Sequence, residues 1–254
     1  MSVFYLKLLI TPMLMLGISL AGKRWGTQLG GLLSGLPLTS ALVMLFIGLE
    51  QGPAFALQAV PGALAGLAAV QATYLCYFLI TRRCPAWLAC CVSLLFYGVG
   101  AWCMSQLGGL VLPVAVTVAM LVANLIATRP HPDLGRARLV PTPRWVIPMR
   151  MATATLLLLA ITASAERLGP VASGVLAPIP VIAWPLMVFA HVQGGRFELA
   201  TIVRGNAIGA VGVIGFYLAM HATIMAWGTG PAIAVAVVLA VVSTFALARV
   251  VNRR

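Results

Sequence analysis

The chain has 254 residues, of which 62% are hydrophobic and only 8% are charged, and its mean hydropathy is +1.06. About a quarter of the residues of a soluble domain are charged, so this composition excludes an ordinary soluble protein. The formal net charge is +12, from 16 Lys and Arg against four acidic residues. The basic residues stand mainly at the ends of apolar segments, as in membrane proteins, and we expect no nucleic-acid partner.

Apolar segments long enough to cross a bilayer follow one another along the chain. We therefore expect an all-α, polytopic integral membrane protein with about nine transmembrane helices. The expected ranges, good to about four residues at each end, are 2–21, 27–49, 54–80, 85–104, 107–128, 145–164, 168–190, 198–221 and 230–249. The first of these has no convincing small-residue cleavage site, so we expect it to be retained.

The basic residues favour one orientation of these helices, because cytoplasmic loops carry an excess of Lys and Arg. One set of alternate loops holds twelve of the 16 basic residues: Lys23, Arg24, Arg82, Arg83, Arg129, Arg136, Arg138, Arg144, Arg196, Arg249, Arg253 and Arg254. The other set holds only Arg167, next to Glu166. We expect the N-terminus outside and the C-terminus in the cytoplasm.

The two halves of the chain are related by an internal repeat. A shift of 143 residues aligns 24–75 with 167–218 without gaps, and 14 of these 52 positions are identical. The matches are mostly Gly, Pro and aromatic residues, and composition alone does not explain them. We expect a 5+4 arrangement, with a five-span repeat (1–128), a cytoplasmic linker (129–144) and a four-span repeat (145–254).

Because the first repeat has an odd number of spans, the second enters the membrane upside down. Inverted-topology repeats are a recurrent architecture of secondary transporters. The alternative is a duplication that only builds a larger helical bundle.

Glycine and proline interrupt the second and seventh expected helices, within GGLLSGLPLTS (30–40) and SGVLAPIPVIAWP (173–185). Each proline frees a backbone carbonyl, which must then face protein, water or a bound solute. Paired breaks in two inverted halves point to a transporter's binding site. The candidate substrate-binding residues here are Gly35, Pro37, Thr39, Ser40, Pro178 and Pro180. Packing kinks healed by neighbouring helices are the alternative.

Ionisable residues within the spans are candidates for recognition and coupling. Lys7 and Arg150 occupy equivalent repeat positions, and Arg204 lies within the eighth span, so these three could bind an anionic solute. Snorkelling to the interface is the alternative for the first two. His191 and Glu198 are candidates for ion coupling, since histidine titrates near neutral pH. A solvated salt-bridge cluster with nearby arginines is the alternative.

Small residues at helical spacing indicate close helix packing in GALAG (62–66) and GNAIG (205–209). Asn206 is expected to find a partner inside the bundle. The five cysteines lack metal or disulfide spacing and are expected to be small, buried apolar residues. Neither HExxH, GxSxG nor a Walker A motif is present, so we expect neither an enzyme nor a cofactor or metal site.

At SGVLAPIPV (173–181) and RFELATIVRG (196–205) the second half resembles the small GlpM-like bacterial inner-membrane proteins. The shared features are a G-x-x-x-P-x-P break and a downstream T-I-V-x-G stretch, and they cover about 50 residues well. The first half matches more loosely, since Pro61 replaces Arg204 and the paired prolines are missing. The resemblance implies a multi-pass protein of the bacterial inner (cell) membrane with a periplasmic N-terminus, and says nothing of the substrate.

Together these patterns favour a secondary inner-membrane transporter or exporter, passive or driven by an ion gradient, for a small anionic or amphipathic solute. The alternative is a non-transporting membrane scaffold or accessory subunit. A channel is disfavoured because the sequence shows neither a ring of charge nor a filter-like loop. The expected partners are the lipid bilayer and a small-molecule or ion substrate, and the sequence also allows a homo-oligomer.

Overall fold

The computed structural model describes residues 3–25, 33, 35–106, 108–129, 145–180 and 183–252, and in these ranges it contains helices and no strand. The helices are α1 (Val3–Trp25), α3 (Leu38–Glu50), α4 (Pro53–Ile80), α5 (Ala86–Gln106), α6 (Val111–Ala127), α7 (Val146–Leu176), α8 (Ala183–Trp227) and α9 (Thr229–Asn252). The all-α prediction is thus confirmed for the described residues. Of the expected linker, only Arg129 falls within them.

Five helical stretches are long and apolar enough to cross a membrane, by length and composition. They are Pro53–Ile80, Ala86–Gln106, Ile147–Leu176, Leu186–Trp227 and Thr229–Val250. Shorter apolar helices cover Tyr5–Leu14, Leu38–Glu50 and Val111–Ala127. These lengths are compatible with a multi-pass membrane protein.

Two of the helices contain a bend at a glycine. α7 has 31 residues and α8 has 45, longer than a bilayer of roughly 30 Å requires at about 1.5 Å per residue. The bends lie at Gly169 (φ 76°) and Gly195 (φ 78°), in a backbone region that favours glycine. Gly52, which precedes α4, has almost the same backbone conformation (φ 90°, ψ 164°) as Gly195 (ψ −165°). These two glycines are equivalent positions of the sequence repeat.

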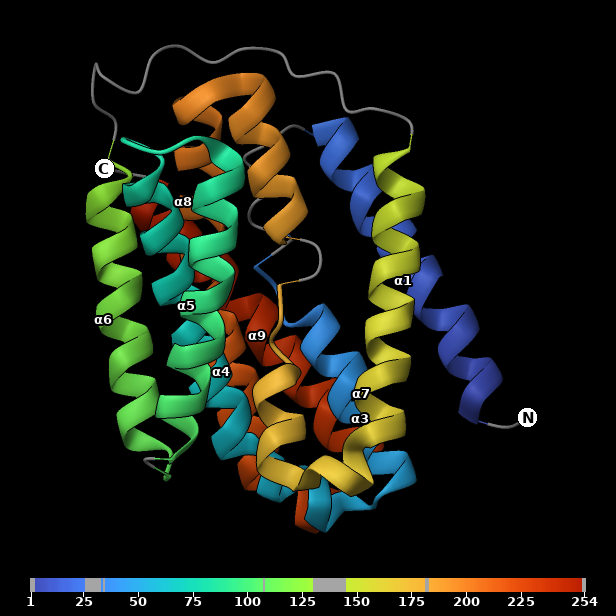
Figure 1. Ribbon diagram of the computed structural model, residues 1–254. Helices are drawn as coiled ribbons and strands as arrows, with labels where there is room; N and C mark the ends of the chain where they lie inside the picture. The colour runs from blue at the N-terminus through green and yellow to red at the C-terminus, as the bar shows by residue number, and fades with distance from the viewer. Residues whose placement is uncertain are drawn as a thin grey trace.

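The helices lie side by side along one long axis, and the two chain ends point to opposite ends of the bundle (Figure 1). α4 is the central helix and packs against α5, α6, α7 and α8, while α8 packs against α9. The largest fully buried side chains come mainly from α4 and α8, among them Tyr74, Tyr77, Phe78, Phe216 and Tyr217. Aromatic packing between these two helices forms much of the core.

α5 and α6 lie at the periphery and turn apolar side chains outward. Trp87, Leu95 and Val111 are 70%, 72% and 82% exposed. Such faces suit contact with lipid rather than water. The expectation that the cysteines are buried is wrong: all five are free thiols, and Cys91 and Cys103 are exposed on α5, because this helix contributes little to the core.

The two predicted interruptions meet near the middle of the bundle, where α7 ends at Leu176 and α3 begins at Leu38 (Figure 1). There the backbone of Gly35 lies directly against α8, and a Cβ on Gly35 would lie 2.9 Å from the Cα of Gly209. Gly66 of α4 is in similar close contact with the ring of Pro178. By the shift of 143 residues, Gly66 corresponds to Gly209 and Pro178 to Gly35, so one contact occurs twice.

This backbone contact predicts the effect of adding a single methyl group. In Gly209→Ala the new Cβ would lie 2.5 Å from the Cα of Gly35, so we expect a loss of roughly 1–3 kcal/mol of stability from overpacking. The thermal unfolding midpoint of the detergent-purified protein measures it. Gly98→Ala on α5 is the control, because its Cβ would meet nothing within 4 Å. Equal midpoints for the two variants would contradict the close contact.

Candidate functional site

A small polar cavity of about 30 Å³ lies where the two interruptions meet. Five residues that the sequence predicts for substrate binding line it: Gly35, Thr39, Ser40, Pro178 and Pro180. Pro37, the sixth, is buried next to the lining residue Leu36 and forms the N-cap of α3. The cavity has about the volume of one water molecule in the liquid. It can therefore accept one small polar group.

Equivalent positions of the two sequence halves line this cavity together. Four pairs related by the shift of 143 residues contribute to it: Gly35 and Pro178, Leu36 and Ile179, Ser40 and Ala183, and Val70 and Val213. The cavity therefore lies between the halves, with backbone from both breaks in its wall.

Two amides from different helices form the polar side of the cavity. Gln71 of α4 donates through Nε2 to Oδ1 of Asn206 on α8 at 3.1 Å, and Asn124 of α6 donates to the carbonyl of Gln71 at 2.9 Å. The prediction that Asn206 finds a partner inside the bundle is confirmed. Among the described residues, Oε1 of Gln71 and the hydroxyl of Tyr74 are buried without a partner. Buried polar groups are normally satisfied, so both are free to bind a solute or water.

The first turn of α3 forms another side of the cavity, through Thr39 and Ser40. Its N-cap, Pro37, makes no side-chain capping hydrogen bond. The first N–H groups of a helix lack intrahelical partners and carry partial positive charge, which favours acceptor atoms and anions. Ser40 donates a long hydrogen bond of 3.5 Å to the carbonyl of Ala177, across the two breaks.

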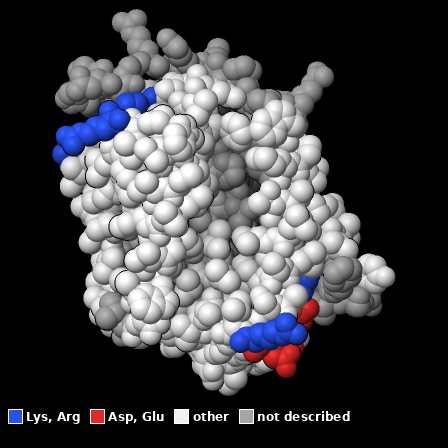
Figure 2. All heavy atoms as spheres, viewed as in Figure 1, with Lys and Arg blue, Asp and Glu red and all other residues white. Residues whose placement is uncertain are grey.

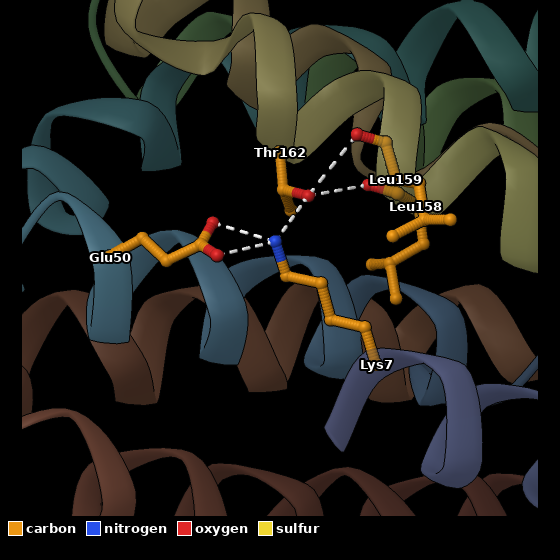
Figure 3. Close-up of polar contacts among 5 residues, drawn as sticks. All are labelled: Lys7, Glu50, Leu158, Leu159 and Thr162. Atoms are coloured by element: carbon orange, nitrogen blue, oxygen red, sulfur yellow. Dashed lines mark hydrogen bonds and ion pairs between the residues drawn. The ribbon is translucent and has the colours of Figure 1, made fainter. Parts of the chain in front are cut away.

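Lys7 lies away from the cavity and is held by other helices. Its Nζ is 2.6 Å and 2.7 Å from the two carboxylate oxygens of Glu50 and donates to Oγ1 of Thr162 at 2.7 Å (Figure 3). The ammonium also lies 5.6 Å from the ring centre of Phe46. Lys7 is only 4% exposed, so its charge joins α1, α3 and α7 in this structure. The side chain of Arg150, its repeat equivalent, lies outside the described part.

A second set of contacts lies where α4 ends and α8 bends. The hydroxyl of Tyr77 is 3.1 Å from Nδ1 of His191, with the two rings edge to face. Arg196 donates to Oγ1 of Thr81 at 3.0 Å and to the carbonyl of Phe78 at 3.2 Å, and lies over the Phe78 ring. These bonds fasten the bend of α8 to the end of α4.

The expected salt-bridge cluster at this end is not formed among the described residues. Arg204 donates to the carbonyl of Leu125 on α6 at 3.1 Å, and it does not line the cavity. Glu198 is only 3% exposed, and its Oε2 has no partner in the described part of the chain. An ionised carboxylate buried in this way is costly, which makes Glu198 a candidate for proton binding.

Charge is therefore concentrated away from the cavity. Figure 2 shows that on this face the described charged side chains gather at two opposite ends, with a recess and almost no charge between them. The residues that line the cavity are all uncharged. Recognition there depends on hydrogen bonds and helix polarity rather than on Lys or Arg.

Sequence reasoning did not select Gln71 or Tyr74 as site residues. The signal for Gln71 was present, because it is a single amide in an otherwise apolar helix. Tyr74 appeared only as a repeat match with Tyr217. Its buried hydroxyl becomes a site feature only once α4 is placed against the break.

Comparison with protein-family models, with curated proteins and with solved structures finds no match for this chain. The resemblance to the GlpM-like proteins stays a prediction. The functional argument therefore depends on the geometry of the site.

The Lys7 ion pair predicts a specific loss of stability. Lys7→Met leaves the Glu50 carboxylate unpaired and should cost about 2 kcal/mol, less than for a fully buried pair because the Glu50 side chain is 27% exposed. Thermal unfolding of Lys7→Met, Glu50→Gln and the double variant forms a cycle that isolates the interaction. The double variant should be more stable than the sum of the single losses implies. Strictly additive losses would mean that the pair contributes nothing.

Proposed function

We propose that the protein is a secondary transporter or exporter of the bacterial inner membrane. It binds a small anionic or amphipathic solute at the cavity between the two breaks. Transport is passive or driven by an ion gradient. The candidate binding residues are Gly35, Pro37, Thr39, Ser40, Pro178 and Pro180.

The observation that carries this proposal is the shared lining of one cavity by equivalent positions of both halves. In transporters built from inverted repeats, broken helices from the two repeats meet at the substrate site near the bilayer midplane. A packing kink does not require a polar cavity with unpartnered buried groups, and here Gln71 and Tyr74 provide such groups.

Two further observations support the inverted repeat. Gly52 and Gly195 share an unusual backbone conformation at equivalent positions. The contact of Gly35 with Gly209 has a counterpart in that of Pro178 with Gly66. We infer nine spans in a 5+4 arrangement, with the N-terminus in the periplasm and the C-terminus in the cytoplasm.

Alternating access requires contacts between the halves that close one end at a time. At one end Lys7 binds Thr162 of the other half at 2.7 Å. At the other, Tyr77 binds His191 at 3.1 Å. We assign these two contacts to opposite gates of the transport cycle. Lys7 then serves in a gate in this state, while Arg204 fastens α8 to α6.

The transport test uses the two prolines that maintain the breaks. The purified chain is reconstituted into liposomes that contain a pH-sensitive dye, and uptake is measured for acetate, lactate, benzoate and phosphate. At least one should enter saturably. Pro37→Leu and Pro180→Leu should reduce its uptake to background, because leucine restores the helical N–H donor and favours a continuous helix.

Pro12→Leu is the matched control, since Pro12 lies inside α1 and lines neither break. It should leave uptake unchanged. Full uptake in both Pro37→Leu and Pro180→Leu would contradict the site. A chain that transports none of the solutes and co-purifies with another membrane protein would favour the scaffold alternative.

Ion coupling is assigned to Glu198, with His191 at the same end of the bundle. Glu198→Gln keeps the shape of the side chain but cannot exchange a proton, so uptake should no longer respond to an imposed pH gradient. The ratio of uptake rates with and without the gradient measures this. Glu166→Gln, an exposed acid on α7, is the control and should keep the response. An unchanged ratio in Glu198→Gln would exclude this residue from coupling.

A further inference from the structure

A second and larger cavity adjoins the polar one. Its volume is about 230 Å³, and it lies between α4, α5, α7 and the start of α8. Val70, Ile179 and Pro180 line both cavities, so the break before α8 is their common wall. The larger cavity is bordered mainly by apolar side chains, including Leu94, Leu157 and Trp184, and no lining residue is charged.

The volume of this cavity limits what it can hold. A dry apolar cavity of about 150 Å³ inside a protein binds benzene. A cavity of about 230 Å³ therefore has room for one aromatic ring or a short hydrocarbon chain. The polar cavity beside it, at about 30 Å³, has room only for a small head group.

Unpartnered donors lie beside the wall between the two cavities. The ring of Tyr74, which lines the polar cavity, stacks on Trp184 of the apolar cavity, with ring centres 6.2 Å apart and planes inclined by 22°. Both the Tyr74 hydroxyl and Nε1 of Trp184 are buried without a partner among the described residues. An N–H and an O–H side by side suit the two oxygens of one carboxylate.

The other polar groups restrict the charge of the head group. The first turn of α3 adds partial positive charge, which suits a single negative charge. A phosphate carries more charge and is usually held by Arg or Lys, and neither type lines these cavities. Oε1 of Gln71 could accept a hydrogen bond from the protonated acid.

We propose that the solute is an amphipathic monocarboxylic acid. Its carboxyl group occupies the polar cavity beside Tyr74, and its ring or short chain occupies the apolar cavity beside Leu157 and Trp184. This inference rests on the proposed transport function and names the substrate class of that site.

Binding is tested on the full chain in lipid nanodiscs, because detergent would itself compete for an apolar cavity. Benzoate and hexanoate are the ring and chain probes, and acetate supplies the head group alone. Thermal unfolding midpoints are followed against concentration. Benzoate or hexanoate should stabilise the protein saturably, at concentrations at least about tenfold below those acetate requires, because burial of the apolar part adds affinity.

Two matched pairs of variants locate the bound acid. Leu157→Trp fills the apolar cavity and should abolish the stabilisation, whereas Leu156→Trp, at a neighbouring position that is 67% exposed, should not. Tyr74→Phe removes one donor and should weaken binding about tenfold. Tyr217→Phe, its repeat equivalent, lines neither cavity and should leave binding unchanged.

The inference is overturned if neither probe binds saturably, or if Leu157→Trp and Tyr74→Phe both bind as the unaltered chain does. It is also overturned if native mass spectrometry finds a retained phospholipid that Leu157→Trp releases and neither acid displaces. The liposome assay separates this inference from the proposed function. Acids that bind but never cross the membrane would refute transport alone. A hydrophilic anion that crosses in a Pro180-dependent way, with no acid binding, would refute the substrate class alone.

Discussion

The close contact between the Gly35 backbone and α8 determines where the rest of the site can form. Carbonyls freed by a broken helix are costly in hydrocarbon and must be covered by protein or by a polar ligand. A side chain at Gly35 or Gly209 would force the break outward, because their backbones lie within the space of a Cβ. The corresponding contact of Gly66 with Pro178 covers the second break. Both interruptions therefore lie inside the bundle, where a polar cavity can persist.

Charge and recognition are separated in this structure. Lys7 and Glu50 join three helices at one end, and Arg196 fastens the bend of α8 at the other. The cavity between them is lined by amides, hydroxyls and backbone. A neutral site binds a solute more weakly than a charged one but releases it more readily, as a carrier must. The charged contacts at the ends can then change during the cycle without altering the binding groups themselves.

Much of the fold could be predicted from hydrophobic length. The segment 54–80 corresponds to α4 (Pro53–Ile80), and the two breaks lie where glycine and proline interrupt apolar runs. The side-chain partners could not be predicted in this way. Gln71 and Asn206 lie 135 residues apart, and their contact depends on how α4 and α8 are rotated about their axes. Helices that are apolar on all faces carry little amphipathic periodicity, so the sequence does not encode that rotation visibly.

Under the proposed repeat, the two halves share a backbone but not the same side chains, and this difference bears on how a solute is oriented. Trp184 corresponds to Ala41, and Tyr97 corresponds to Ala240. The large aromatic side chains that border the apolar cavity therefore have only small, buried counterparts in the other half. Backbone symmetry would let the site face both sides of the membrane in turn. The unequal side chains would nevertheless hold the apolar part of a solute on one side of the axis throughout, so that only the protein around it has to move.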